Sequence, residues 1–168
     1  MTLTGKAWKF GDGISTDHIA PGRLFHLRSN LPEFAKHVLE DARPEFASQV
    51  EKGDFVVGGR NFGQGSSREH APTIIKMAGV SAVIAKGFAR IFFRNCINVG
   101  LPAIILDTDP INEGDELEVD LAAGTLLDKT TGQEFTFPPL PPAMAAILND
   151  GGLVAHIKKH GGLALDES

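Results

Sequence analysis

The chain has 168 residues, 42% of them hydrophobic and 22% charged, a composition that suits one globular domain spanning residues 1–168. Its net charge of −5 gives no electrostatic footprint for a phosphate backbone, so we expect no nucleic-acid partner. No apolar run approaches a membrane span and the N-terminus lacks the apolar core of a secretory signal, so we expect no membrane association and a cytoplasmic location.

Over residues 7–106 the predicted elements alternate between short strands and helices. We expect strands at 7–10, 54–57, 80–84 and 103–106. Apolar residues at helical spacing predict helices at 31–39, shortly after Pro44, at 67–78 and at 89–99, whereas 15–23 is predicted to be a polar loop. This alternation indicates an α/β architecture with a parallel sheet.

The last third of the chain has a different pattern. Short β segments are expected at 116–120, 125–127 and 134–137, with a hairpin turn at 131–132. Prolines end these segments, and two short helices are expected at 142–148 and 152–159. The sequence therefore predicts a mixed fold in which an α/β part is followed by a β-rich part.

The single cysteine, Cys96, restricts the metal and redox chemistry of the chain. One thiol excludes an intrachain disulfide, and one thiolate cannot hold a zinc ion or an iron–sulfur cluster alone. Cys96 lies in an apolar, helix-like run, which is typical of a small buried hydrophobic residue. We expect this chain to bind no metal.

A glycine-rich stretch at 58–72 separates a predicted strand from a predicted helix. Glycine allows positive φ angles and lets a backbone approach a ligand closely. Ser66 or Ser67 would cap the helix, and a helix N-terminus favours anions. Arg68 adds a forked donor that suits a carboxylate or phosphate. Composition alone is equally compatible with a structural loop that ends in a capping box.

A second polar stretch covers residues 11–23. Asp17 beside His18 could orient a proton-transfer group or bind a hydroxyl, and the simpler alternative is an Asx-type turn followed by a proline. Arg23 and Arg28 flank an apolar and aromatic loop at 24–27. Each of these arginines is a candidate carboxylate clamp or an ordinary surface charge.

Three blocks of the chain together resemble the swivelling domain of the aconitase superfamily, especially the separate small subunits of 3-isopropylmalate dehydratase and homoaconitase. The blocks are 11–23 (GDGISTDHIAPGR), 61–72 (NFGQGSSREHAP) and 85–102 (AKGFARIFFRNCINVGLP), in the order and at the spacing of that family. The resemblance covers most of 7–106 and, more loosely, the β-rich end. It implies a three-layer β/β/α fold.

The resemblance also implies an activity. Enzymes of this superfamily move water between adjacent carbons of a hydroxy di- or tricarboxylic acid, with an iron–sulfur cluster as the Lewis acid. The cluster cysteines lie on the large subunit, so a 4Fe-4S cluster and a large partner subunit are expected outside this chain. We expect the small subunit of a hydro-lyase, first of all a 3-isopropylmalate dehydratase of leucine biosynthesis, that is inactive alone.

The family motifs assign roles to individual residues. Ser66 matches the serine whose alkoxide is the general base, and Ser67 would position the substrate. Arg68 would clamp one substrate carboxylate. Arg28 is the candidate for a second carboxylate, with Arg23 as its rival.

Other matched residues are expected to act less directly. Asp17 resembles the aspartate that pairs with a catalytic histidine of the large subunit. His18 and His70 are assigned structural roles. We expect three residues of the predicted helix 89–99 to connect it to the site or to the partner: Arg90, Arg94 and Asn95.

The loop at 24–29, where the family selects its substrate, matches neither the isopropylmalate nor the homoaconitate pattern. His26 either faces the variable group of the substrate or is a solvated loop histidine. Isopropylmalate, homocitrate or homoaconitate, and dimethylmalate-like acids all remain candidate substrates.

Other classes of function remain open besides the hydro-lyase. A serine hydrolase would use Ser66, His70 and Asp17, although the chain has no Gly-x-Ser-x-Gly elbow. A non-catalytic module for anion binding or assembly would use the same helix start. A family member that has kept the fold and lost the reaction is a further alternative.

Overall fold

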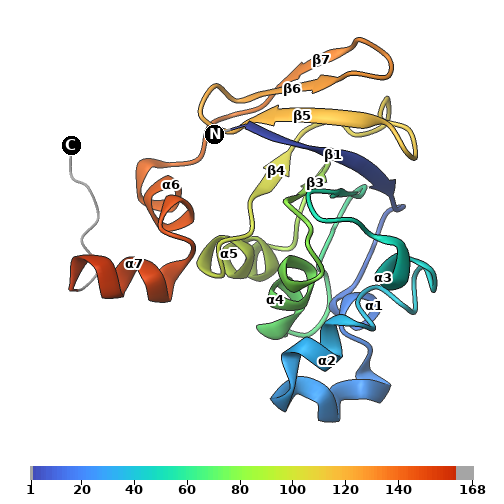
Figure 1. Cartoon of the computed structure of the whole chain (residues 1–168), viewed down its shortest axis with the longest axis vertical. Helices are drawn as coiled ribbons and strands as arrows, with labels where there is room; N and C mark the ends of the chain where they lie inside the picture. Colours follow the sequence, from blue (N-terminus) through green and yellow to red (C-terminus); the bar gives the residue numbers. More distant parts are fainter. Residues whose placement is uncertain (1, 162–168) are drawn as a thin grey trace.

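One seven-stranded sheet, in the order β4-β3-β2-β1-β5-β6-β7, runs through the computed structural model, which describes residues 2–161 (Figure 1). The central strand β1 pairs in parallel with β2 and antiparallel with β5. It therefore divides the sheet into a parallel half and an antiparallel half. The strands are β1 (Thr2–Lys9), β2 (Phe55–Val57), β3 (Ala82–Ala85), β4 (Ala103–Ile105), β5 (Glu116–Asp120), β6 (Thr125–Asp128) and β7 (Glu134–Thr136).

The sheet curls so that its antiparallel half covers one face of its parallel half. Strands β2 and β3 are buried on both faces, which explains their continuous apolar sequence. Val56 and Val83 pack against apolar side chains of the helices. Phe55 and Ile84 point the other way, into a cluster with residues of β5 and β6. Helices, parallel strands and antiparallel strands thus form the three β/β/α layers that the family resemblance implied (Figure 1).

Most of the helices lie on the outer side of the parallel strands, and the last two form an arm beside them (Figure 1). The helices are α1 (Thr16–Ile19), the 3₁₀ helix η1 (Gly22–Ser29), α2 (Leu31–Ala35), α3 (Phe46–Gln49), α4 (His70–Met77), α5 (Arg90–Asn98), α6 (Pro142–Asn149) and α7 (Leu153–His160). Within the described residues, none of these helices is long and apolar enough to cross a membrane.

Several predicted boundaries were wrong. Strand β1 begins at Thr2 instead of residue 7, because antiparallel pairing with β5 supplies partners for its first half. The predicted polar loop at 15–23 contains helix α1. This helix begins with a reciprocal capping box between Ser15 and His18. Helix α2 ends at Ala35 instead of residue 39, and Leu39 has a positive φ of 57°.

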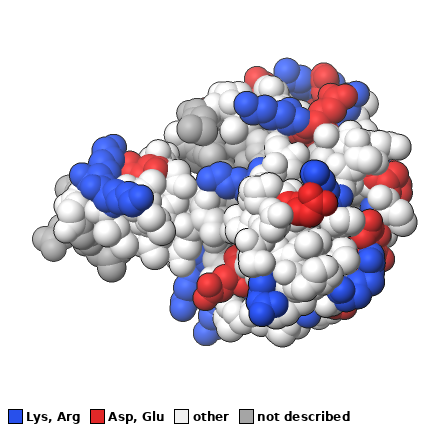
Figure 2. All heavy atoms as spheres, turned by 60° about the horizontal axis from the view of Figure 1, so that its bottom comes forward, with Lys and Arg blue, Asp and Glu red and all other residues white. Residues whose placement is uncertain are grey.

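Helices α6 and α7 form an arm at the C-terminal side of the described chain. The chain reverses between them at Gly151 and Gly152, whose φ angles are 88° and 127°. Both helices also contact α5. Figure 2 shows the arm standing out from the rest of the surface, with basic side chains beside acidic ones.

Candidate active site

The three sequence blocks converge at one edge of the parallel sheet. Each follows the carboxyl end of a strand: block 11–23 follows β1, block 61–72 follows β2, and block 85–102 begins where β3 ends. These strands are parallel neighbours in the sheet, so their carboxyl ends meet there. Ligands of open α/β sheets bind at this kind of edge. The convergence identifies the candidate site.

Backbone hydrogen bonds fix the three blocks to one another. The N–H of Gly13 donates to Arg60 O at 2.8 Å, and the N–H of Gly63 donates to Ile14 O at 2.7 Å. The N–H of Phe62 donates to Gly87 O at 3.0 Å. The loop after β2 is therefore held between the other two blocks by the main chain.

The interpretation of Ser66 and Ser67 as helix caps was wrong. Helix α4 begins at His70, and its N-cap residue, Glu69, makes no side-chain capping bond. The loop before it is tied to α1 instead, because the Thr16 hydroxyl donates to Ser66 O at 2.8 Å and the Thr16 N–H donates to Gln64 O at 2.8 Å. Both serines lie exposed on this loop.

Gly63 allows the loop to pass close to α5. Its φ is 86°, and a Cβ atom there would lie 2.1 Å from Cγ of Phe92. Any side chain would collide with the ring in a backbone conformation that already disfavours L-residues. Steric contact with Phe92 therefore requires glycine at residue 63, and this requirement could not be seen in the sequence alone.

A pocket of about 210 Å³ lies between this loop and the first turn of α5. It is lined by Thr16, Gly63, Gly65, Ser66, Ser67, Arg68, Ala89, Arg90, Ile91, Phe92 and Asn95. The first N–H groups of a helix have no partners within that helix and favour an anion. The helix start that faces Ser66 is therefore that of α5, and not that of α4 as the sequence suggested.

Arg68 connects the polar groups of the site. Its Nη1 donates to the carbonyl oxygen of Ala20 and lies 3.2 Å from Oδ1 of Asp17. Its Nε lies 3.3 Å from the Ser66 hydroxyl oxygen and donates to it. The Arg68 side chain is only 17% exposed, so its surroundings hold the guanidinium in place. Ser66 thus faces a fixed positive charge.

Asp17 is positioned by the turn at Gly22. The Gly22 N–H donates to Asp17 Oδ1 at 2.9 Å. A Cβ atom on Gly22 would lie 2.7 Å from that oxygen and 3.5 Å from Nη2 of Arg68. The glycine therefore keeps the carboxylate and the guanidinium within reach of each other.

Phe25 connects the two arginines predicted to bind substrate. The guanidinium carbon of Arg28 lies 4.4 Å from the centre of the Phe25 ring, and that of Arg68 lies 5.8 Å from it. His70 packs against Phe25 and stacks on Phe34, with ring centres 5.6 and 5.4 Å apart. Burial, followed by the charges of Arg68 and Arg28, lowers the pKa of His70. Neutral His70 adds no charge beside the arginines.

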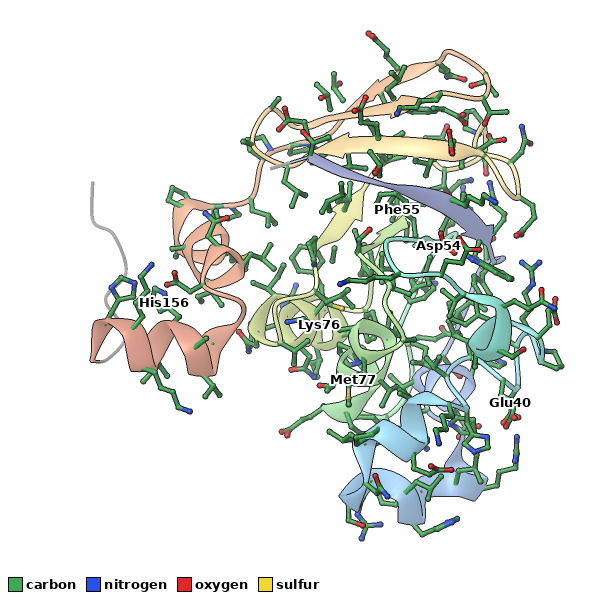
Figure 3. All side chains as sticks on the ribbon, viewed as in Figure 1. Glu40, Asp54, Phe55, Lys76, Met77 and His156 are labelled. Carbon is green, nitrogen blue, oxygen red and sulfur yellow. The ribbon has the colours of Figure 1, made fainter. Side chains whose placement is uncertain are left out.

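The remaining predicted residues lie apart from this cluster. Arg23 donates to Glu40 at 2.6 Å and to Asp41 at 2.8 Å, so its guanidinium is engaged in a separate ion-pair group. Glu40 is labelled in Figure 3, on the far side of η1 and α2 from the arm. His26 lies exposed on η1, and the His18 ring bonds to Ser15 as a helix cap.

Three residues of the site were missed by the sequence interpretation: Thr16, Gly22 and Phe25. Thr16 and Gly22 lie inside block 11–23, whose length signalled a constrained loop without indicating which members contact Arg68 or the serine loop. Phe25 could have been identified as an aromatic residue between two arginines.

The geometry removes the main argument for a serine hydrolase. Ser66 and His70 do not share a helical face, because the helix begins at His70. Among the described residues, the Ser66 hydroxyl receives its side-chain hydrogen bond from Arg68 and none from a histidine. A guanidinium cannot act as the base of a catalytic triad.

Comparison with known proteins agrees with the fold and the blocks. Residues 28–108 match the family model described as the aconitase C-terminal domain. The chain is 62% identical to "3-isopropylmalate dehydratase small subunit 2" of Archaeoglobus fulgidus, over 98% of this chain and 100% of the relative. It is 54% identical to "Methanogen homoaconitase small subunit" of Methanothermobacter thermautotrophicus, over 94% and 91%.

A solved structure gives the same result. The crystal structure of 3-isopropylmalate dehydratase (leuD) from Methanocaldococcus jannaschii is 43% identical and covers 96% of each chain, with a TM-score of 0.91. The fold and these identities extend over nearly the whole chain, which includes the three blocks. The chain therefore belongs to the aconitase C-terminal domain family, within the group of separate dehydratase small subunits.

Proposed function

We propose that this chain is the small subunit of a heteromeric hydro-lyase that isomerises a 2-hydroxy dicarboxylic acid, with 3-isopropylmalate as the first candidate substrate. One observation carries the proposal: Ser66 and Arg68 face the start of α5 across a pocket. The chain that holds this pocket is 62% identical to a named 3-isopropylmalate dehydratase small subunit. The tricarboxylic homoaconitate is the second candidate, because a homoaconitase small subunit is 54% identical.

Ser66 is proposed to move the proton. In the dehydration, its alkoxide takes the proton from the carbon beside a carboxylate, a C=C bond forms, and hydroxide leaves the adjacent carbon. In the hydration, the same oxygen returns the proton. A free serine is too weak an acid to supply an alkoxide, so cations must stabilise it. Arg68 Nε at 3.3 Å and the first turn of α5 supply that positive potential.

Arg68 and Arg28 are proposed to bind the substrate carboxylates. Both guanidinium groups lie against Phe25, which gives a dicarboxylate two cations on one surface. Arg23 is less suitable because it already pairs with Glu40 and Asp41.

Asp17, Ser67 and His26 are proposed to have supporting roles. Asp17 positions Arg68, and its side chain is 64% exposed, which leaves one oxygen for a histidine of the large subunit. Ser67 lines the pocket and would donate to the substrate. His26 is exposed on η1, where it would face the variable group of the substrate.

The iron–sulfur cluster is assigned to the large subunit. Cys96 is the one thiol of this chain, and burial raises its pKa well above the ordinary value. A cluster needs several thiolates, so the residues of this chain do not fit one. We assign the departure of the hydroxyl to the large subunit. We assign the proton transfer and the binding of the substrate carboxylates to this chain.

The test is anaerobic co-purification with a cluster-bearing large subunit, followed by an absorbance assay of the double bond with 2-alkylmaleates and homoaconitate. We expect activity only in the complex, with an alkylmaleate as the best substrate. Ser66→Ala should abolish activity while the complex still forms, and Ser48→Ala is the matched surface control. A fully active Ser66→Ala complex would refute the general-base role. If no large subunit co-purifies and the chain alone binds phosphate, the result would favour the non-catalytic anion-binding module.

A further inference from the structure

The arm formed by α6 and α7 holds a cluster of side chains that the hydro-lyase reaction does not use. Asp150 ends α6, and the reversal at Gly151 and Gly152 brings α7 back beside it. His156 and His160 are four residues apart, so they share one face of α7. Both point at Asp150 (His156 is labelled in Figure 3).

The distances within this cluster are short. His156 Nδ1 lies 2.7 Å from Asp150 Oδ2, and His160 Nε2 lies 3.0 Å from the same oxygen. The two imidazole centres are 4.6 Å apart. One potential ligand atom from each of the three residues lies within 4.8 Å of the others. Two imidazole nitrogens therefore converge on one carboxylate oxygen.

The donor atoms of the cluster suit a cation. Carboxylate oxygens and imidazole nitrogens are ligands of divalent transition metals, and a bound ion would replace the hydrogens shared between the two rings and Asp150. Lys159 Nζ lies 3.0 Å from the other carboxylate oxygen, where it would orient a ligating carboxylate from outside.

Burial supplies an independent observation. The His156 side chain is only 1% exposed, and Asp150 is 9% exposed. Little water competes for the ligand atoms of these two side chains, so their electrostatic interaction with a cation would be strong.

The single cysteine led us to expect no metal in this chain; we propose instead that Asp150, His156 and His160 form a binding site for a divalent transition metal of the zinc class. Two imidazoles and one carboxylate are a common ligand set for Zn²⁺, with a fourth position left for water. The site would fasten α7 to the end of α6. The Gly151 carbonyl, at the reversal, already accepts from Lys76 at 3.4 Å, and Lys76 also donates to Val99 O at 2.8 Å just after α5. The metal would thus stabilise the packing of the arm on α5.

The test is a titration of the full chain, with any affinity tag removed, with Co²⁺ and then Zn²⁺ in metal-free buffer. We expect one Co²⁺ per chain with the visible absorption of tetrahedral coordination, displacement by Zn²⁺, and a rise in the unfolding temperature with Zn²⁺. His160→Gln should weaken binding by at least about 100-fold, because even residues that only support metal ligands account for 10–100-fold.

The controls keep the proposal open to refutation. His160 is 36% exposed, so His160→Gln should fold, and Asp150→Asn should weaken binding as well. His37→Gln is the matched control, because His37 is 32% exposed and pairs with Glu40 away from the arm. Absence of stoichiometric binding, equal binding by His160→Gln and the parent chain, or equal loss in His37→Gln would overturn the site. None of these outcomes depends on the large subunit or on dehydratase activity.

Discussion

Replacing Arg68 with lysine tests the assigned chemistry without removing the positive charge. Arg68 uses Nη1 toward Ala20 and Asp17 and Nε toward Ser66. Lysine has one nitrogen at its tip and cannot maintain both directions at once. A hydrogen bond to a charged group contributes about 1.5–3 kcal/mol. Losing the one to Ser66, and part of the carboxylate clamp, should raise the barrier by about 3 kcal/mol.

A change of about 3 kcal/mol corresponds to roughly a 100-fold loss in kcat/KM. The assay is absorbance of the double bond in the reconstituted complex. The free energy of unfolding should change by about 1 kcal/mol or less, because the partner Asp17 is 64% exposed. Arg23→Lys serves as the comparison and should stay within threefold of the parent. Activity of Arg68→Lys within threefold of the parent, or an equal loss in Arg23→Lys, would refute the reasoning.

Three further predictions concern single substitutions. Asp17→Asn keeps the acceptor for the Gly22 N–H and removes the charge opposite Arg68, so kcat/KM in the same assay should fall about 10-fold with little change in unfolding by urea. Gly63→Ala should lower the free energy of unfolding by about 2 kcal/mol or more, because the new Cβ would collide with Phe92 and alanine disfavours the left-handed backbone conformation. Gly132→Ala is the control, because Gly132 also has a positive φ, of 80°, but has no atom close to the added Cβ. Burial and then Asp115 raise the pKa of Asp128, so the stability that protonated Asp128 contributes is present at low pH and is lost as pH rises through that pKa. The change that Asp128→Asn causes in the free energy of unfolding should therefore be more stabilising at pH 8 than at pH 4 by about 1 kcal/mol, as measured by urea unfolding. An equal change at both pH values would contradict the assignment.

The residue patterns predicted an α/β part followed by a β-rich part because the two halves of the sheet have different patterns, whereas the three layers were implied by the family resemblance. Apolar runs at 55–57 and 82–85 are buried on both faces, and the weaker alternation at 116–120 suits a strand buried on one face. The first half of β1 was missed because its partner, β5, lies more than 100 residues later in the chain. No local pattern specifies such a pairing.

The sequence identified residues of the candidate site but not how they are arranged in space. Ser66, Arg68 and Asp17 were named as candidate site residues, and they lie together in the structure because their blocks follow adjacent parallel strands. The serines were placed at a helix cap because Ser–x–x–Glu patterns usually start helices. Here the tertiary hydrogen bonds from Thr16 tie that segment to α1, and helix α4 starts only at His70. A bond between residues 50 positions apart could not be inferred from local preference.

The openness of the site gives a physical reason for the partner subunit that we propose. Ser66 and Ser67 are exposed, and most of Asp17 is in contact with water. Water weakens every charge interaction that would stabilise a serine alkoxide, since the effective dielectric constant is high at such a surface. The curled sheet and the main-chain bonds between blocks hold the reacting groups rigidly, but nothing among the described residues closes over them. In the proposed complex, covering this edge of the sheet would therefore be a physical contribution of the large subunit, separate from the metal chemistry that we propose for it.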